Sequence, residues 1–207
     1  MSNQRAKPGR RYRLLLYERL YAMIRWPCLL IAIATFALWW YAPGVTFLAS
    51  RGDWLLTVAI LTGLLFLASL VARYLSFVQC FPNFVRIQTP LYRVVISYQR
   101  VTQVRPIIFK EMYPPSKQRW SQRRFLEPFF GLTAVGINLT GYPLSERWLR
   151  LWLNDYTFTR DIPGFMFLVG DWMSLSREID GYRDRWLTKK LQDARPPRPS
   201  ISPFLQQ

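Results

Sequence analysis

The stretch FVRIQTPLYRVVISYQRVTQVRP, residues 84–106, decides which fold this sequence predicts. Val85 and Ile87 alternate with Arg86 and Gln88, and the same alternation resumes at Val94. A period of two is typical of half-buried β-strands. Pro90 interrupts the alternation, and proline cannot donate a hydrogen bond to a central ladder. The stretch therefore predicts two short strands joined by a turn.

Similar runs continue along the chain. Residues 101–109 are less regular, which predicts a strand with a helical turn or a bulge. In residues 133–139, β-branched residues and leucine alternate with Ala134, Gly136 and Asn138, and in residues 148–153 a leucine stands at every second position. Residues 165–171 form a continuous apolar run. Short strands at regular spacing are typical of a small barrel or sandwich. We expect a curled antiparallel sheet.

The pattern changes after residue 171, where apolar residues recur every three or four positions. This spacing predicts an amphipathic helix whose narrow stripe must pack on an apolar surface. Asp171 or Ser174 is suited to cap its first turn. We expect the helix to close one end of the curled sheet through Leu175, Ile179, Tyr182 and Trp186.

Two long apolar segments precede the strands, at residues 26–50 and 54–72, and neither contains a charged residue. At about 1.5 Å per helical residue, each can cross a hydrocarbon core of about 30 Å. A secretory signal peptide and a pair of buried soluble helices are the alternatives. The long basic segment before the first run and the second run directly after it argue against a signal peptide. We expect a two-span helical hairpin.

Charge distribution predicts how this hairpin is oriented. The chain carries 28 Lys and Arg against 12 Asp and Glu, and Glu18 is the one acidic residue before the first run. The positive-inside rule then places both termini in the cytoplasm and the protein in the plasma (inner) membrane. The segment from Arg10 to Trp26 is expected to be an interfacial helix near anionic lipids. Expected anchors at the membrane surfaces are Trp26, Trp39, Trp40 and Trp54.

The hairpin followed by strands and a terminal helix resembles the bacterial membrane-bound proteins with a pleckstrin-homology-like (PH-like) domain. The matching positions are Ile87, Thr89, Ile96, Arg100, Val101 and Val104. The resemblance implies an α+β membrane protein with a binding or scaffolding role. The expected organisation is a basic segment (1–25), a transmembrane hairpin (26–77), a PH-like domain (78–194) and a proline-rich, extended tail (195–207).

Residues 110–131 break the strand rhythm with a mixture of basic and aromatic side chains. Such a surface suits anionic lipid headgroups or a protein partner, including a second copy of the chain. It also suits nucleic acid, which membrane anchoring disfavours. Phe125, Phe129 and Phe130 are alternatively core residues. The expected interface residues are Arg10, Arg11, Arg13, Lys117, Arg119, Trp120, Arg123 and Arg124.

The residue inventory argues against catalysis. The sequence has no histidine, and its two cysteines, Cys28 and Cys80, do not have the spacing of a zinc site. We find no glycine-rich phosphate loop. We therefore expect no catalytic, cofactor-binding or metal-binding residues. The expected function is a non-catalytic, membrane-anchored binding module, and the alternative is an accessory subunit of a larger membrane complex.

Overall fold

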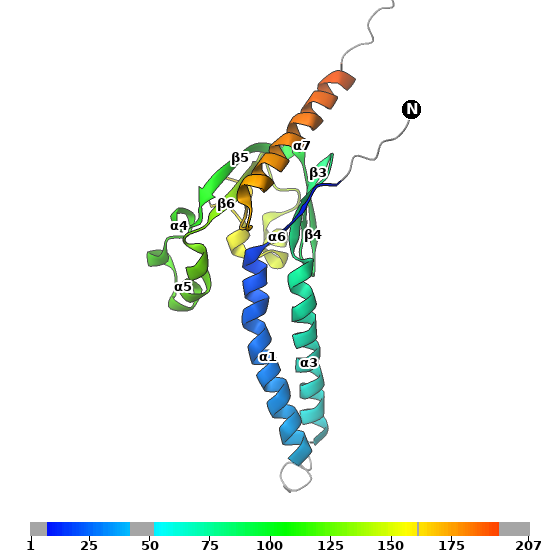
Figure 1. The fold of residues 1–207 in the computed structure, drawn as a ribbon, viewed down its shortest axis with the longest axis vertical. Coiled ribbons are helices and arrows are strands. Elements are labelled where there is room, and N and C mark those ends of the chain that lie inside the picture. Colours follow the sequence, from blue (N-terminus) through cyan, green and yellow to red (C-terminus); the bar gives the residue numbers. More distant parts are fainter. Residues whose placement is uncertain (1–7, 42–51, 161, 195–207) are drawn as a thin grey trace, which may run out of the picture.

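The computed structural model describes residues 8–41, 52–160 and 162–194. These residues form an α+β protein with two long apolar helices and two antiparallel sheets. Figure 1 shows the helices as a hairpin that projects from one end of a mixed domain. The expected proline-rich tail, residues 195–207, lies outside the described residues.

Helices α1 (Leu15–Tyr41) and α3 (Gly52–Leu75) run side by side in opposite directions (Figure 1). Both are long and apolar enough to span a membrane. On α3, the small residues Ala59, Ser69 and Ala72 are buried, and small residues permit helices to approach closely. Most large apolar side chains of the hairpin are exposed in the isolated chain.

The hairpin is inserted between two neighbouring strands. Strand β1 (Arg11–Arg13) pairs antiparallel with β2 (Phe77–Cys80), and Tyr12 lies opposite Val78. The expectation of one helix from Arg10 to Trp26 is therefore wrong at its start, because the helix begins at Leu15. Both membrane-length helices thus connect directly to one sheet.

In both sheets, strands that are neighbours in the sequence are also neighbours in the sheet. In the first, β1 and β2 are followed by β3 (Phe84–Gln88) and β4 (Arg93–Ser97), in the order β1-β2-β3-β4. A short 3₁₀ turn, η2 (Tyr98–Arg100), then leads to the second sheet. That sheet contains β5 (Val101–Ile108), β6 (Thr133–Leu139) and β7 (Gly164–Phe167), in the order β5-β6-β7.

Most of the predicted strands are confirmed. The alternation in β3 and β4 buries Val85, Ile87 and Ile96 completely. The expected irregularity after Val101 is also present, because the β5–β6 register shifts between Val101 and Gln103. The strand predicted over 165–171 ends earlier, at Phe167, and the carbonyl oxygen of Leu168 accepts a hydrogen bond from the Leu15 backbone N–H at 2.9 Å.

The strand predicted over 148–153 is wrong, because this segment is part of helix α6 (Glu146–Trp152). Leu149 and Leu153, four residues apart, are buried, whereas Leu151 is 70% exposed. That is a helical face rather than the alternation of a strand. A 3₁₀ turn, η5 (Asp155–Thr157), follows.

The segment between β5 and β6 is a small helical unit. It contains α4 (Phe109–Met112), η3 (Pro115–Lys117), α5 (Trp120–Leu126) and η4 (Glu127–Phe129). Leu126 and Phe129 are buried in a second hydrophobic cluster, and Phe125 and Phe130 pack against it. The alternative of core residues is thus confirmed for Phe129, and Phe125 and Phe130 are half-buried at the edge of the same cluster.

The final helix, α7 (Trp172–Asp193), is capped by Asp171, whose side chain accepts a hydrogen bond from the Ser174 backbone N–H. Leu175 and Ile179 are fully buried in the main core, as the sequence predicts. Further along α7, the carboxylate of Glu178 accepts a hydrogen bond from the hydroxyl of Tyr12, with 2.7 Å between the oxygens. The last helix is thereby tied to the first strand.

Candidate functional site

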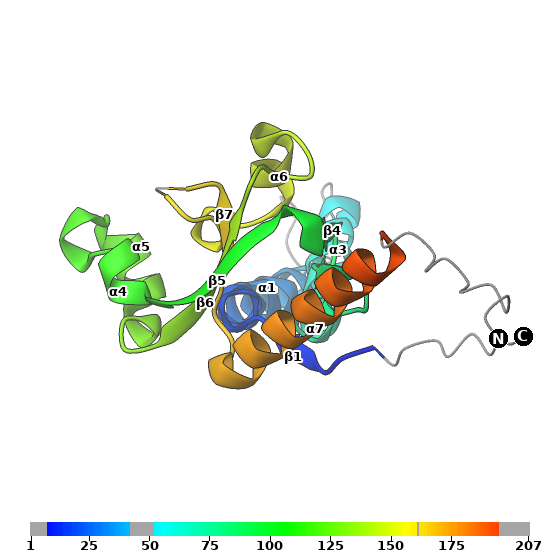
Figure 2. The same ribbon diagram turned by 90° about the horizontal axis from the view of Figure 1, so that it is seen from above.

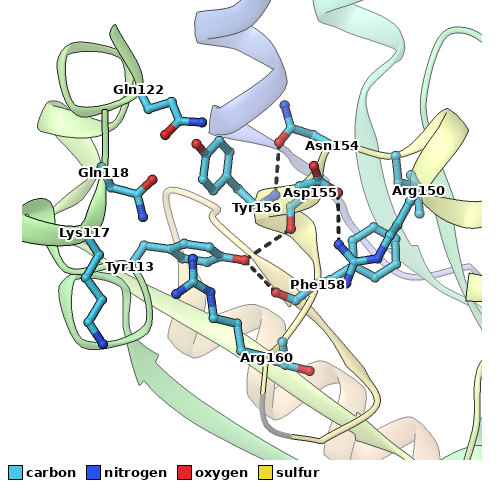
Figure 3. Close-up of a pocket in the computed structure, with 12 residues that line it drawn as sticks. Tyr113, Lys117, Gln118, Gln122, Arg150, Asn154, Asp155, Tyr156, Phe158 and Arg160 are labelled. Carbon is cyan, nitrogen blue, oxygen red and sulfur yellow. Dashed lines mark hydrogen bonds and ion pairs between the residues drawn. The ribbon is translucent and has the colours of Figure 1, made fainter. Parts of the chain in front are cut away.

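The candidate site is a polar hollow of about 680 Å³. Figure 3 shows it between the segment that carries η3 and α5 and the segment that carries α6 and η5. Its lining side chains include Tyr113, Lys117, Gln118, Gln122, Arg150, Asn154, Asp155, Tyr156, Thr159 and Arg160.

Three cations line this hollow, Lys117, Arg150 and Arg160, and Asp155 is the one carboxylate among the lining residues. Arg150 is held in place by Asp155, with 3.0 Å between nitrogen and oxygen, and by Glu146 at 2.8 Å. Hydrogen bonding to Glu146 raises the pKa of Arg150 above its ordinary value. The positive charges therefore exceed the negative ones, so the hollow suits an anionic group.

The wall of the hollow is built around Tyr113. Its hydroxyl proton is shared between the backbone oxygens of Asp155 and Phe158, which lie 3.1 and 2.9 Å from the hydroxyl oxygen. Burial raises the pKa of Tyr113 further above its ordinary value, so the phenol stays protonated also in alkaline solution. The Arg160 guanidinium lies over the Tyr113 ring, 4.5 Å from its centre. This stacking orients one of the three cations.

The hollow is coupled to the hairpin through Asn154. The backbone N–H of Asn154 donates to the hydroxyl of Tyr17 in the first turn of α1, at 3.0 Å. Its side-chain oxygen accepts a hydrogen bond from the Tyr156 backbone N–H at 3.0 Å. A movement of the first turn of α1 would therefore reach one edge of the site.

A second hollow of about 720 Å³ adjoins the first, since Lys117 and Arg160 line both. It adds Arg105, whose buried Nε atom has no hydrogen-bond partner. Its wall also contains Ile107 and Trp172. Lys117 and Arg160 can consequently meet an anionic group from either side.

Most of the interface residues expected between 110 and 131 lie close together in the structure. Lys117 lines both large hollows, and Trp120, Arg123 and Arg124 line a smaller one of about 320 Å³ on α5. Arg119 precedes α5 as its capping residue. Figure 1 shows α5 beside the first turns of α1.

Arg19 on α1 fixes this position of α5. Its guanidinium donates hydrogen bonds to the backbone oxygens of Phe125 and Arg124, at 2.9 and 3.3 Å. Trp120 stays 75% exposed, with the Arg124 guanidinium 5.6 Å from its ring centre. The helix therefore presents a basic and aromatic surface next to the hairpin.

The other expected interface arginines lie elsewhere. Arg10, Arg11 and Arg13 belong to β1 or immediately precede it, and in Figure 2 this strand lies on a different side of α1 from α5. The guanidinium groups of Arg11 and Arg13 lie over the rings of Phe77 and Tyr74, at 4.8 and 5.3 Å. These three residues do not join the site on α5.

The expected anchors lie along the hairpin. Trp26, Trp40 and Trp54 are 59%, 67% and 74% exposed, and Trp39 is half-buried. Trp40 and Trp54 lie near the ends of their helices that are farthest from the domain, whereas Trp26 lies nearer to it. Their role as interfacial anchors stays a prediction.

Sequence reasoning missed Arg150, Arg160, Tyr113 and Asn154. One usable signal was the pair Glu146 and Arg150, which is four residues apart and typical of an exposed helix. No pattern along the chain predicts that Arg160 stacks on Tyr113, because these residues are brought together only by the tertiary fold.

No family model, curated protein or solved structure matches this chain. Within residues 8–41, 52–160 and 162–194, no group of three or more His, Cys, Asp or Glu side chains could hold a metal ion. Function is therefore inferred from the basic hollow, from α5 and from the hairpin.

Proposed function

We propose that this chain is a membrane-anchored, non-catalytic binding module that holds anionic phospholipid headgroups at the cytoplasmic face of the plasma membrane. The observation that carries the proposal is the hollow lined by Lys117, Arg150 and Arg160, which lies beside the first turn of an apolar hairpin. A phosphate group offers several acceptor oxygens to such cations.

The exposed surface of the hairpin supports anchoring in a bilayer. Large apolar side chains cover both helices, including Leu30 and Phe36 on α1 and Leu61 and Leu64 on α3, each at least 50% exposed. Burying such a side chain in apolar surroundings is worth about 1.5–3 kcal/mol. Water would leave these side chains of both helices exposed, whereas a lipid bilayer would bury them and so stabilise the hairpin.

Charged residues support the position of the site relative to the lipid. Arg73 on α3 pairs with Glu18 on α1, with 2.8 Å between nitrogen and oxygen, where the helices leave the domain. Arg19 and α5 meet at the same end of α1. In a hairpin that spans a bilayer, this is the level of the lipid phosphates. The arginine excess before α1 supports the cytoplasmic orientation.

The arrangement of strands supports a PH-like domain. A four-stranded and a three-stranded antiparallel sheet share one core with the C-terminal helix α7, whose Leu175 and Ile179 are buried there. Strands closed by a single terminal helix are the plan of such domains. This supports binding rather than a reaction.

Lipid retention tests the proposal. The full chain, extracted in mild detergent and mixed with phosphatidylglycerol, should carry bound lipid in native mass spectrometry. Lys117→Gln with Arg160→Gln should reduce this lipid, because each cation near an anionic headgroup contributes about 1 kcal/mol. Lys189→Gln with Lys190→Gln, at the exposed end of α7, is the control with the same change in charge.

Two further samples separate the possible ligands. Phosphatidylcholine tests whether a net negative charge is needed, and inorganic phosphate tests whether the phosphate alone is sufficient. Equal loss of phosphatidylglycerol in both double variants would refute the proposal. Displacement of the lipid by inorganic phosphate at low concentration would indicate a site for a free phosphate compound instead.

The second candidate function is an accessory subunit, and α7 favours it. Figure 1 shows α7 extending beyond the two sheets, and there Leu187 and Leu191 are 39% and 69% exposed. A protein partner could cover them. Extraction in mild detergent tests this function, because a subunit should co-purify with a partner in fixed ratio, whereas a free chain should migrate at 24.6 kDa plus its micelle.

A further inference from the structure

The domain carries a patch of exposed apolar side chains that the basic site does not use. Leu91 and Leu151 are 76% and 70% exposed, and Leu144 and Trp148 are 45% and 47% exposed. Leu91 lies in the turn between β3 and β4, and the other three lie on or just before α6. We call these four residues the apolar rim.

The apolar rim lies at the end of the domain from which the hairpin emerges. Strand β2 begins two residues after α3 ends, and its first residue, Phe77, pairs with Gln88 at the end of β3. The β3–β4 turn is therefore at the α3 end of the sheet. Helix α6 lies at this end as well, because Asn154, just after it, bonds to Tyr17 in α1 (Figure 1).

Aromatic contacts join the turn and α6 into one surface. The rings of Tyr92 and Trp152 are stacked with their centres 5.6 Å apart. The indole N–H of Trp148 donates to the hydroxyl of Tyr92 at 3.3 Å. Trp148 and Trp152 also meet edge to face at 6.0 Å. The patch is thus held by packed rings rather than by a loose loop.

Charges around the apolar rim favour lipid as its occupant. Arg93 follows the turn and Arg147 precedes Trp148, and both are exposed. Apolar side chains flanked by arginines are typical of segments that insert shallowly among anionic headgroups. The surface is also continuous with the hairpin, because the turn lies at the end of the sheet where α3 joins it.

We propose that the apolar rim inserts into the bilayer leaflet next to the domain, as a second membrane contact beside the hairpin. The inference rests on the proposed membrane anchoring, but it does not depend on headgroup binding by Lys117 and Arg160. Leu91, Trp148 and Leu151 enter the headgroup region, and Arg93 and Arg147 contact the phosphates.

Site-specific fluorescence in nanodiscs tests this inference. Leu91→Cys and Leu151→Cys are made in a Cys28→Ala background and labelled with an environment-sensitive dye, while the fully buried Cys80 stays unlabelled. Leu191→Cys on α7 is the matched control, because Leu191 is 69% exposed in the chain and Leu151 is 70% exposed. A dye on native Cys28, within α1, reports on the anchoring itself.

Lipids that carry a nitroxide near the headgroup should quench the dyes at 91 and 151 about twofold or more beyond the dye at 191. Cys28 lies nine helical residues beyond Arg19, so its dye is tested with lipids that carry the nitroxide along an acyl chain. Quenching at Cys28 by these lipids, without headgroup quenching at 91 and 151, would overturn the insertion of the apolar rim and leave the anchoring intact. Failure of the acyl-chain nitroxide to quench at Cys28 would overturn the anchoring. Spontaneous disulfides between two copies at position 151 would assign the surface to self-association instead, and would also overturn the inference.

Discussion

Substitutions at Tyr12 and Glu178 test whether their hydrogen bond fixes strand β1 to helix α7. The phenol hydroxyl and carboxylate oxygens are 2.7 Å apart, and the Tyr12 side chain is buried. The other oxygen of Glu178 accepts the exposed backbone N–H of Arg10 at 3.1 Å. We expect Tyr12→Phe and Glu178→Ala both to destabilise the domain, and to do so through the same contact.

The size of the effect follows from this geometry. A hydrogen bond to a charged group is worth about 1.5–3 kcal/mol, and the exposed bond from Arg10 is worth about 0.5 kcal/mol. Tyr12→Phe should therefore lower the unfolding free energy by about 1.5–2 kcal/mol and Glu178→Ala by about 2–3 kcal/mol. The double variant should resemble Glu178→Ala, which gives a coupling energy equal to the Tyr12→Phe loss, about 1.5–2 kcal/mol.

Unfolding of the full chain in mild detergent, followed by tryptophan fluorescence as urea is raised, measures these values. Asp184→Ala is the control, because it removes a carboxylate from the exposed side of the same helix. It should change stability by less than about 0.5 kcal/mol. Additive single variants, or an equal loss in Asp184→Ala, would refute the role of this contact in fixing β1.

Two further predictions concern the sheets. Burial raises the pKa of the Cys80 thiol from 9.0 to about 12, so the stability that this thiol contributes is complete below pH 9 and is lost between pH 9 and 12. Iodoacetamide at pH 9 should therefore modify Cys80 rapidly only when urea unfolds the domain. Equal modification rates with and without urea would contradict this. A Cβ atom on Gly164 would overlap the Ile137 carbonyl oxygen across β6 and β7, whereas one on Gly131 would meet nothing within 4 Å. Gly164→Ala should therefore lower the unfolding free energy by about 2 kcal/mol or more and Gly131→Ala by less than about 0.5 kcal/mol. Equal melting temperatures for the two variants would contradict the pairing register of β6 and β7.

The strands that the sequence predicted correctly are those in which local pattern and burial coincide. In β3, Val85 and Ile87 face the core and Arg86 does not, so the alternation is visible without the fold. The strand predicted at α6 is wrong because a leucine at every second position, from Leu149 to Leu153, also resembles the alternation of a strand. Only the i, i+4 pair of Leu149 and Leu153, together with the ion pair between Glu146 and Arg150, distinguishes a helix there.

Other features could not be predicted from local sequence at all. Strand β1 is three residues long, and its partner begins at Phe77, beyond both long helices. Lys117 was identified because it lies in a basic segment, but Arg160 and Arg150 reach the same hollow from a distant part of the chain. Only the tertiary fold brings these charges together.

The insertion of the hairpin between β1 and β2 has a mechanical consequence. A domain on a single linker can swivel freely, whereas this one is attached at two adjacent points, through Leu14 before α1 and Ser76 after α3. Leu14 donates its backbone N–H to the Ser76 carbonyl oxygen at 3.2 Å, so the two attachments are also joined to each other. A tilt of the two long helices should therefore rotate the first sheet with them, so that the hairpin and the domain move as one rigid body.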